Sequence, residues 1–126
     1  KENISAEVID VRSLVPLDAA AILASVAKTG RLVVADYAHR TAGAAAEIAA
    51  IVAEEGFADL RAPIQRVTTP DVQIPFSPKL ERPLYPNKDR SAAAAREAGR
   101  SGAERGPWPV KAYCRSGEWE STKARS

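Results

Sequence analysis

Hydrophobic positions follow strand and helix periods in turn along the first part of the chain. Residues 6–11 alternate apolar and polar side chains and are rich in β-branched residues, which predicts a β-strand. Asp18 predicts the start of a helix over residues 19–28, because its carboxylate can accept a hydrogen bond from the first turn. Gly30 follows at the position where a left-handed residue commonly ends a helix.

The alternation continues through a second helix and a third strand. Residues 32–35 form a continuous apolar run, which predicts a strand buried on both faces. A second helix is expected to open at Thr41 or Gly43 and to end near Glu55, and residues 64–68 predict the third strand. The core face of this helix is expected to carry Ile48, Ile51 and Val52. The order strand–helix–strand–helix–strand predicts a three-layer α/β/α fold with a mostly parallel sheet and right-handed crossovers.

The chain changes character after the third predicted strand, where prolines recur. We expect residues 70–85 to form an extended but ordered loop, because apolar side chains along it can anchor it. Those anchors are Val72, Ile74, Phe76, Leu80, Leu84 and Tyr85. Pro86 is predicted at the first position of a last helix over residues 87–98. We therefore expect a domain over residues 1–98, and a disordered Gly/Ser/Arg-rich tail over residues 99–126.

Composition excludes several kinds of protein. The hydrophobic fraction is 45%, but about 25 of these residues are alanine, so the core is modest for 126 residues. His39 and Cys114 are the only histidine and cysteine, which excludes an internal disulfide and a metal site built from these residue types. The sequence has no apolar run as long as a membrane span and no signal-peptide core after its charged start. We expect a soluble, cytoplasmic chain that binds neither a membrane nor a metal.

The positive charge is concentrated in the tail. Residues 1–98 carry about 12 basic and 13 acidic side chains, whereas residues 99–126 carry about 6 and 3. A nucleic-acid surface usually gathers Lys and Arg on one face of a folded element. The nearly neutral body therefore argues against a nucleic-acid partner.

The loop over residues 36–43 is the first candidate site. It follows the carboxyl end of a predicted strand and precedes a helix, where N–H groups attract anions and parallel sheets place ligands. His39 and Arg40 would add charge and donors, which predicts a small-anion site, although the loop lacks the glycine pattern of nucleotide sites. Alternatively, Thr41 caps the helix, Asp36 pairs with Arg40, and His39 is an exposed loop residue.

The residues alone do not assemble an active site. The sequence has no Gly-x-Ser-x-Gly nucleophile turn, and Cys114 lies in the polar tail, far along the chain from His39. The aspartates do not have the spacing of a calcium loop. We therefore assign no catalytic, cofactor-binding or metal-binding residue.

An ordered series of motifs resembles a known protein family. Residues 40–48, Arg-Thr-Ala-Gly-Ala-Ala-Ala-Glu-Ile, resemble an Arg-Thr-Gly-Gly-Phe-Gly-Ala-Glu-Ile run in β subunits of thiamine-diphosphate-dependent 2-oxoacid dehydrogenases. These subunits belong to the E1 components of pyruvate, branched-chain and acetoin dehydrogenase complexes, and the matching part is their transketolase C-terminal-like domain. Further similar stretches are residues 6–18, 29–34, 62–72, 74–76, 80–81 and 85–87. The resemblance covers residues 4–98, and the succession of motifs is more specific than any one of them.

The sequence departs from the family pattern in two places. Family members begin this domain with another strand and helix, which this chain lacks, so we expect an exposed sheet edge. Ala42, Ala44 and Ala45 replace two glycines and the phenylalanine of the family motif, and only Gly43 remains. Since glycine permits positive φ and close backbone approach, these replacements bear on the conformation of the loop.

The resemblance implies an assembly domain that is inactive alone. The parent reaction would be oxidative decarboxylation of a 2-oxo acid with acyl transfer to lipoyl-E2. Thiamine diphosphate and Mg²⁺ would bind to other parts of the parent enzyme. The implied partners are the E1 α subunit, a second β subunit, and the subunit-binding domain of the E2 acyltransferase. The residues expected at these contacts are Arg40, Thr41, Gly43, Glu47, Phe76, Leu84 and Tyr85.

Two other functions remain open at this point. The first is the related C-terminal domain of a transketolase or a deoxyxylulose-phosphate-synthase-type enzyme, against which the motif at residues 40–48 and Thr-Pro-Asp at residues 69–71 favour the E1 branch. The second is a standalone module that binds a small anion near His39 and Arg40.

Overall fold

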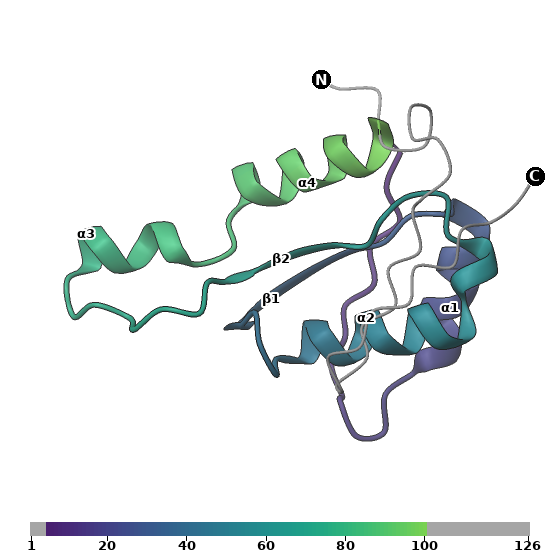
Figure 1. Ribbon diagram of the computed structural model, residues 1–126, viewed down its shortest axis with the longest axis horizontal. Helices are drawn as coiled ribbons and strands as arrows, with labels where there is room; N and C mark the ends of the chain where they lie inside the picture. The colour runs from purple at the N-terminus through teal and green to yellow at the C-terminus, as the bar shows by residue number, and fades with distance from the viewer. Residues whose placement is uncertain (1–4, 101–126) are drawn as a thin grey trace, which may run out of the picture.

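Helices and strands alternate through most of the described chain (Figure 1). The computed structural model describes residues 5–100. In chain order the elements are α1 (Ala19–Thr29), β1 (Val33–His39), α2 (Ala44–Glu55), η1 (Phe57–Asp59), β2 (Gln65–Thr69), α3 (Pro78–Glu81), η2 (Arg82–Leu84) and α4 (Lys88–Arg100). This order matches the predicted α/β class, apart from the first strand.

The sheet lies between helices on both of its faces. Strands β1 and β2 are parallel, with Val33 opposite Gln65, and the register becomes irregular between Asp36 and His39. Figure 1 shows α4 on one side of the strands and α1 and α2 on the other, and α4 contacts both strands. The predicted three-layer α/β/α arrangement with a parallel sheet is confirmed.

Helices α1 and α2 form the centre of the core. Ile22 and Val26 from α1 meet Ile48 and Val52 from α2, and Val52 has no exposed surface. Half-buried side chains surround this cluster: Leu17, Leu23, Leu32, Val34, Leu60 and Ile64. Full burial of a side chain such as Val26 or Val52 stabilises the fold by about 1.5–3 kcal/mol, and the half-buried side chains contribute less. The predicted core face of α2 is confirmed for Ile48 and Val52.

The ends of α1 follow from its flanking residues. The Asp18 carboxylate accepts a hydrogen bond of 3.0 Å from the N–H of Ala21. Gly30 has a φ of 71° and donates its N–H to the carbonyl of Val26 at 2.7 Å. A Cβ at Gly30 would approach the Arg61 side chain to 2.7 Å. Both predicted helix ends are therefore confirmed, and conformation and space each favour glycine at position 30.

Two arginines attach α4 to the rest of the fold. Arg90 donates to the carbonyl oxygens of Thr68 and Leu84, each at 2.8 Å. Arg31 donates to the carbonyl oxygen of Ala98 at 2.8 Å. The helix is therefore held near both of its ends by charge-assisted bonds to backbone acceptors.

No helix of the described residues is long and apolar enough to cross a membrane.

The segment over residues 5–15 is not a strand in this structure. Residues 5–13 have no regular secondary structure and a bend and turn begin at residue 14, and the sheet of the described residues consists of β1 and β2. Val8 is 88% exposed and Val15 is 92% exposed. The predicted strand over residues 6–11 is therefore wrong here, because β-branched residues favour a strand only when the backbone finds a hydrogen-bonding neighbour.

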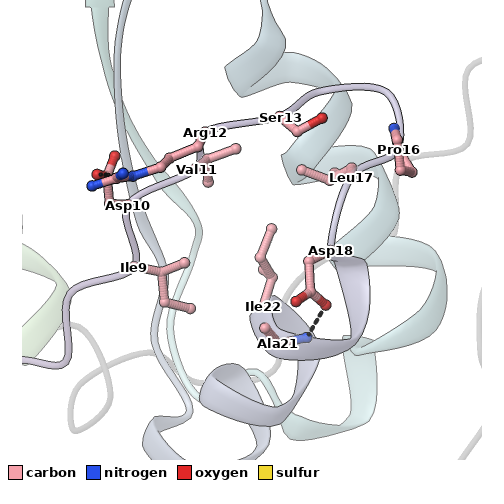
Figure 2. A pocket seen from close by; sticks show the side chains of 10 residues that line it. All are labelled: Ile9, Asp10, Val11, Arg12, Ser13, Pro16, Leu17, Asp18, Ala21 and Ile22. Atoms are coloured by element: carbon pink, nitrogen blue, oxygen red, sulfur yellow. Dashed lines mark hydrogen bonds and ion pairs between the residues drawn. The ribbon is translucent and has the colours of Figure 1, made fainter.

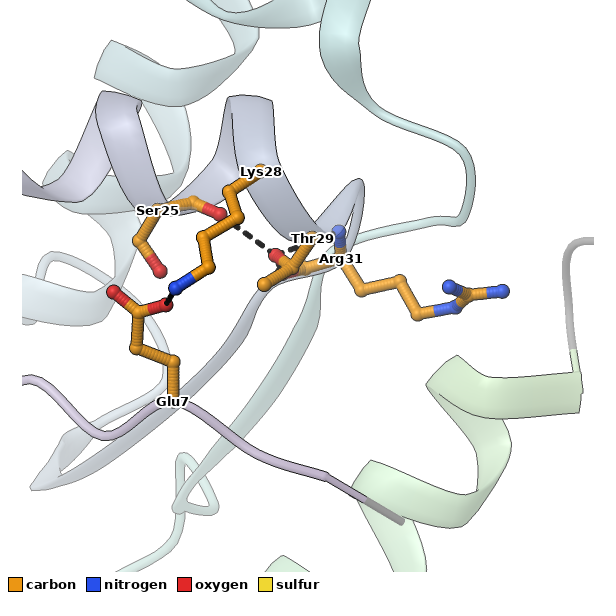
Figure 3. Close-up of polar contacts among 5 residues, drawn as sticks. All are labelled: Glu7, Ser25, Lys28, Thr29 and Arg31. Carbon is orange, nitrogen blue, oxygen red and sulfur yellow. Dashed lines mark hydrogen bonds and ion pairs between the residues drawn. The ribbon is translucent and has the colours of Figure 1, made fainter.

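Polar bonds link the segment over residues 5–15, which we call the arm, to the end of α1. Figure 3 shows Lys28 of α1 reaching Glu7, with 2.8 Å between Nζ and the carboxylate. Donation to Glu7 and its negative charge raise the pKa of Lys28. Beside this pair, the Thr29 hydroxyl donates to the carbonyl of Ser25 at 2.8 Å. Exposed ion pairs of this kind contribute little to stability, so this pair holds the arm only weakly against α1.

Three further predictions need correction. Residues 32–35 are not buried on both faces, since 32–34 are half-buried and Ala35 is exposed. The segment over residues 70–85 is not wholly extended, since it contains α3 and η2. Pro86 does not open the last helix; the side chain of Asn87 caps it, accepting 2.9 Å from the N–H of Arg90.

The predicted domain boundary falls inside α4. The helix continues to Arg100, two residues past the expected end at position 98. Residues 101–126 lie outside the described residues, so the disordered tail stays a prediction.

Candidate functional site

The loop after β1 is bonded to the segment after β2. The Thr41 N–H donates to Asp71 at 3.0 Å, and the Thr41 hydroxyl donates to the same carboxylate at 2.7 Å. The Nε2 of His39 lies 3.3 Å from the carbonyl oxygen of Val72. Two segments that are thirty residues apart thus meet at the carboxyl ends of the two strands.

The carboxylate of Asp71 is the acceptor in this arrangement. Hydrogen bonds from the hydroxyl and then the N–H of Thr41 lower the pKa of Asp71, although partial desolvation opposes them. The nearby positive charges of His39 and Arg40 lower this pKa further. The loop is therefore held most firmly when Asp71 is ionised.

Asp36 occupies the amino-terminal end of α2. One of its carboxylate oxygens accepts from the N–H of Ala45 at 3.1 Å, and the other accepts from Ala38 at 3.0 Å. The expected pair of Asp36 with Arg40 does not form, and Thr41 does not cap α2, whose N-cap residue is Gly43. A protein carboxylate thus already binds where the anion was expected, which does not favour an anion site there.

Arg40 is bonded to the neighbouring strand region. Its backbone N–H donates to the carbonyl oxygen of Thr69 at 2.9 Å, and its guanidinium lies 3.4 Å from the carbonyl oxygen of Arg66. Arg66 in turn donates to the carbonyl of Arg40 at 3.1 Å. These backbone contacts hold Arg40 against β2, and its side chain remains exposed.

The backbone of the loop is strained at one residue. Ala42 has a φ of 57°, which costs roughly 1–2 kcal/mol for a residue other than glycine. At Gly43, a Cβ would lie 2.5 Å from the carbonyl oxygen of His39, so the close approach requires glycine. The loop therefore keeps a conformation that suits glycine at both positions although one of them is alanine.

The residues predicted at subunit contacts fall into two groups. Arg40, Thr41, Glu47 and Phe76 are exposed. Gly43, Leu84 and Tyr85 are half-buried. The structure brings Arg40 and Thr41 close to the base of the segment that carries Phe76, through the bonds to residues 69–72.

Tyr85 has a supporting position. Its ring lies 5.5 Å from the ring of Tyr37, and its hydroxyl donates to Glu81 at 2.8 Å. That hydrogen bond, with desolvation and the charge of Glu81, raises the pKa of Tyr85. The tyrosine pair therefore joins the turn after η2 to the end of β1.

A hollow of about 300 Å³, which was not among the predicted sites, lies beneath the arm. Figure 2 shows Ile9 and Val11 on one side and Leu17 and Ile22 on the other. Its two carboxylates are engaged, because Asp10 pairs with Arg12 and Asp18 caps α1. The alternating apolar pattern of the arm was the only signal that could have indicated an apolar surface here.

The described residues do not fit thiamine diphosphate or Mg²⁺. None of the described His, Cys, Asp or Glu side chains gather in a group of three that could hold a metal ion. The amino-terminal end of α2, where a small anion was predicted, is occupied by the Asp36 carboxylate. No catalytic step is therefore assigned to this domain.

Comparison with known proteins identifies the family. Residues 1–90 match the family model described as the C-terminal domain of transketolase. The chain is 45% identical over 97 residues to the acetoin:2,6-dichlorophenolindophenol oxidoreductase β subunit of Bacillus subtilis, covering 77% of this chain and 28% of that protein. It is 47% identical over 98 residues to the mitochondrial pyruvate dehydrogenase E1 component subunit beta-2 of Oryza sativa, covering 78% and 26%.

A third relative gives the same picture. The pyruvate dehydrogenase E1 component subunit beta of Bacillus subtilis is 42% identical over 97 residues, covering 77% of this chain and 30% of that protein. The chain thus spans less than a third of the length of these relatives. Since the family model matches well over half of the chain and the fold agrees, the chain belongs to the transketolase C-terminal domain family, in the branch similar to E1 β subunits.

Proposed function

We propose that this domain is the C-terminal assembly domain of the β subunit of a 2-oxoacid dehydrogenase E1. The observation that carries the proposal is the identity of 42–47% with β subunits of pyruvate dehydrogenase and acetoin oxidoreductase. The parent enzyme would oxidatively decarboxylate a 2-oxo acid and transfer the acyl group to lipoyl-E2. Thiamine diphosphate and Mg²⁺ would act in other domains of that enzyme, in the cytoplasm.

The role of this domain is to make contacts between subunits. Its partners would be the E1 α subunit, a second β subunit and the subunit-binding domain of E2. The exposure of Phe76 and the position of Arg40 and Thr41 beside the same segment support this role. The half-buried contact candidates Gly43, Leu84 and Tyr85 would act by shaping that surface.

The relatives and the geometry favour this function over its two alternatives. The relatives described above are β subunits of acetoin and pyruvate enzymes, which argues against a transketolase or deoxyxylulose-phosphate-synthase-type parent. The carboxylate of Asp36 at the start of α2 argues against a small-anion module around His39 and Arg40.

The proposal is tested on the full polypeptide that carries this domain. It is purified with its α subunit, thiamine diphosphate and Mg²⁺, and assayed with pyruvate, branched-chain 2-oxo acids and acetoin. The electron acceptor is 2,6-dichlorophenolindophenol, and ketol transfer between sugar phosphates is assayed in parallel. We expect dye reduction with at least one of these substrates, whereas ketol transfer alone would contradict the proposal.

A domain exchange tests the contribution of this domain itself. The matched 97 residues of the Bacillus subtilis acetoin β subunit are replaced by the corresponding part of this chain. The control receives the C-terminal domain of a transketolase in the same place. We expect only the first chimaera to assemble with its α subunit and to keep activity, because its contact surface is the more similar one.

A further inference from the structure

The two edges of the sheet differ in how their backbone groups are bonded. The N–H of Gln65 donates to the carbonyl of Leu32 at 3.0 Å, so the backbone groups of Gln65 point toward β1. Successive residues of a strand point these groups to opposite sides, and the pairing of β1 with β2 stays regular as far as Thr68. The N–H and C=O groups of Arg66 and Thr68 therefore point away from β1, and we call them the outer edge of β2.

Two arginines from different elements reach the outer edge of β2. Arg90, on α4, donates to the carbonyl oxygen of Thr68 at 2.8 Å. The guanidinium of Arg40, in the loop after β1, donates to the carbonyl oxygen of Arg66 at 3.4 Å. Bonds from charged donors are stronger than neutral ones and weaken with distance, so the Arg90 bond is the firmer of the two. Both carbonyl oxygens of this edge are thus engaged by guanidinium groups.

Further bonds fix Arg90 in this position. Its guanidinium also donates to the carbonyl oxygen of Leu84 at 2.8 Å, and its backbone N–H donates to the Asn87 side chain at 2.9 Å. Arg90 is half-buried, and Thr68 beside it is only 3% exposed. The domain itself therefore covers the outer edge of β2 at Thr68.

The opposite edge of the sheet, along β1, has no such contacts. Val33 and Ala35 point their backbone groups away from β2, because the carbonyl of Leu32, one residue earlier in the alternation, points toward it. None of residues 5–100 donates to or accepts from these outward groups, and Ala35 is exposed. The arginines thus cover one edge of the sheet and not the other, which makes β1 an internal comparison.

We infer that Arg90 and Arg40 close the outer edge of β2 against strand addition by a second copy of this chain. An unpaired strand edge is a template for another strand, which would lie about 4.8 Å away. The guanidinium groups occupy this space, and an incoming N–H could reach the carbonyl oxygens of Arg66 and Thr68 only by displacing them. A second copy supplies a matching strand, because a twofold axis at this edge would pair β2 with itself. The inference does not depend on the function proposed above.

The test removes both arginines from the full polypeptide that carries this domain, purified without partner subunits. Arg40→Ala with Arg90→Ala is expected to raise its self-association constant about tenfold or more over the wild type, because the strand edge becomes available for pairing. Sedimentation velocity over a range of concentrations measures the association. If the double variant does not fold, Arg40→Ala alone leaves the bonds of Arg90 in place and is expected to give a smaller increase.

The matched control is another arginine that holds α4 but touches no strand edge. Arg31 donates to the carbonyl oxygen of Ala98 at 2.8 Å, near the other end of the helix. Arg31→Ala therefore loosens α4 in a comparable way, and is expected to leave self-association at the wild-type level. The melting temperatures of the variants show how far each one loosens the domain.

Hydrogen exchange identifies the edge at which the copies meet. In the associated double variant, peptides that contain Arg66 and Thr68 should become protected, whereas those that contain Val33 and Ala35 should exchange as in the wild type. Protection along β1 instead would show that the arginines do not close the edge of β2. Unchanged self-association of a folded double variant, or an equal increase in Arg31→Ala, would also overturn the inference. None of these measurements uses catalysis, so the E1 function stands or fails separately.

Discussion

The two ends of β1 are held in place by different interactions. At its start, Val34 packs against the buried cluster of α1 and α2, where side chains such as Val52 are completely covered. At its end, Tyr37 is exposed, and its carbonyl accepts the hydroxyl of Thr69 at 2.7 Å. Burial therefore secures the first end, and hydrogen bonds secure the second.

The two ends of β1 therefore contribute differently: the first mainly to the stability of the domain, the second mainly to the position of the loop that follows. A buried aliphatic side chain contributes about 1.5–3 kcal/mol, whereas a hydrogen bond contributes a net 0.5–1.5 kcal/mol. Substitutions at the first end should therefore cause the larger loss in the free energy of unfolding. Substitutions at the second end should mainly change how the loop after β1 and the segment after β2 lie.

The largest effect is expected at the buried end. Ile48→Ala removes a nearly covered side chain of α2 and leaves a cavity, which should lower the free energy of unfolding by about 3 kcal/mol. Val15→Ala, at an exposed position of the arm, should change it by less than about 0.5 kcal/mol. Hydrogen exchange of the α2 amides measures both, and equal effects would show that α1 and α2 are not the centre of stability.

A smaller loss is expected at Asp36, which lies between the two ends of β1. Asp36→Ala removes the acceptor for the Ala45 N–H at the start of α2 and should cost about 1 kcal/mol, the usual effect of a lost cap. Asp36→Asn keeps an acceptor and should cost less. The first-turn amides of α2 report the change by hydrogen exchange, and identical behaviour of both variants would rule out a capping role.

The core helices and the strand expected over residues 6–11 differ in how well the sequence predicts them. Core helices were predictable because the spacing of Ile48 and Val52 and the caps Asp18 and Gly30 are local signals. The strand expected over residues 6–11 was not realised, because local pattern does not show whether a pairing partner is present.

The bonds within the candidate site could not be predicted either. Thr41 meets Asp71 only because two parallel strands end side by side, and nothing in either local sequence specifies that pair. From the sequence alone, the carboxylate of Asp36 could pair with Arg40 or accept a hydrogen bond from a backbone N–H. Only the folded geometry shows that it accepts from the first turn of α2. The location of the loop was predictable from strand order, but its hydrogen bonds were not.

A modest gain is expected at the strained residue of the loop. Ala42→Gly relieves a left-handed conformation, and the cost of a more flexible unfolded chain offsets part of the gain, leaving about 0.5 kcal/mol of stabilisation. Ala50→Gly, at an exposed position inside α2, should instead destabilise by about 1 kcal/mol. Thermal unfolding compares them, and a loss at both positions would show that Ala42 is not strained.

The weakest and most local effect is a response to acid at the Thr41–Asp71 pair. Hydrogen bonds from Thr41 and the charges of His39 and Arg40 lower the pKa of Asp71 below its ordinary value of 3.8. A lowered pKa means that the ionised group stabilises the fold above that ordinary value. The contribution is lost as pH falls through the pKa of the folded state.

This acid response is measured at the Thr41 amide. Its proton donates to Asp71, so its chemical shift should follow the protonation of that carboxylate with a midpoint below 3.8. Asp71→Asn keeps an acceptor but cannot ionise, and should remove the titration while leaving α2 intact. A midpoint at or above 3.8 would mean that Thr41 does not stabilise the carboxylate, and the contacts of His39 with Val72 and of Arg40 with Thr69 would then be what holds this end of β1.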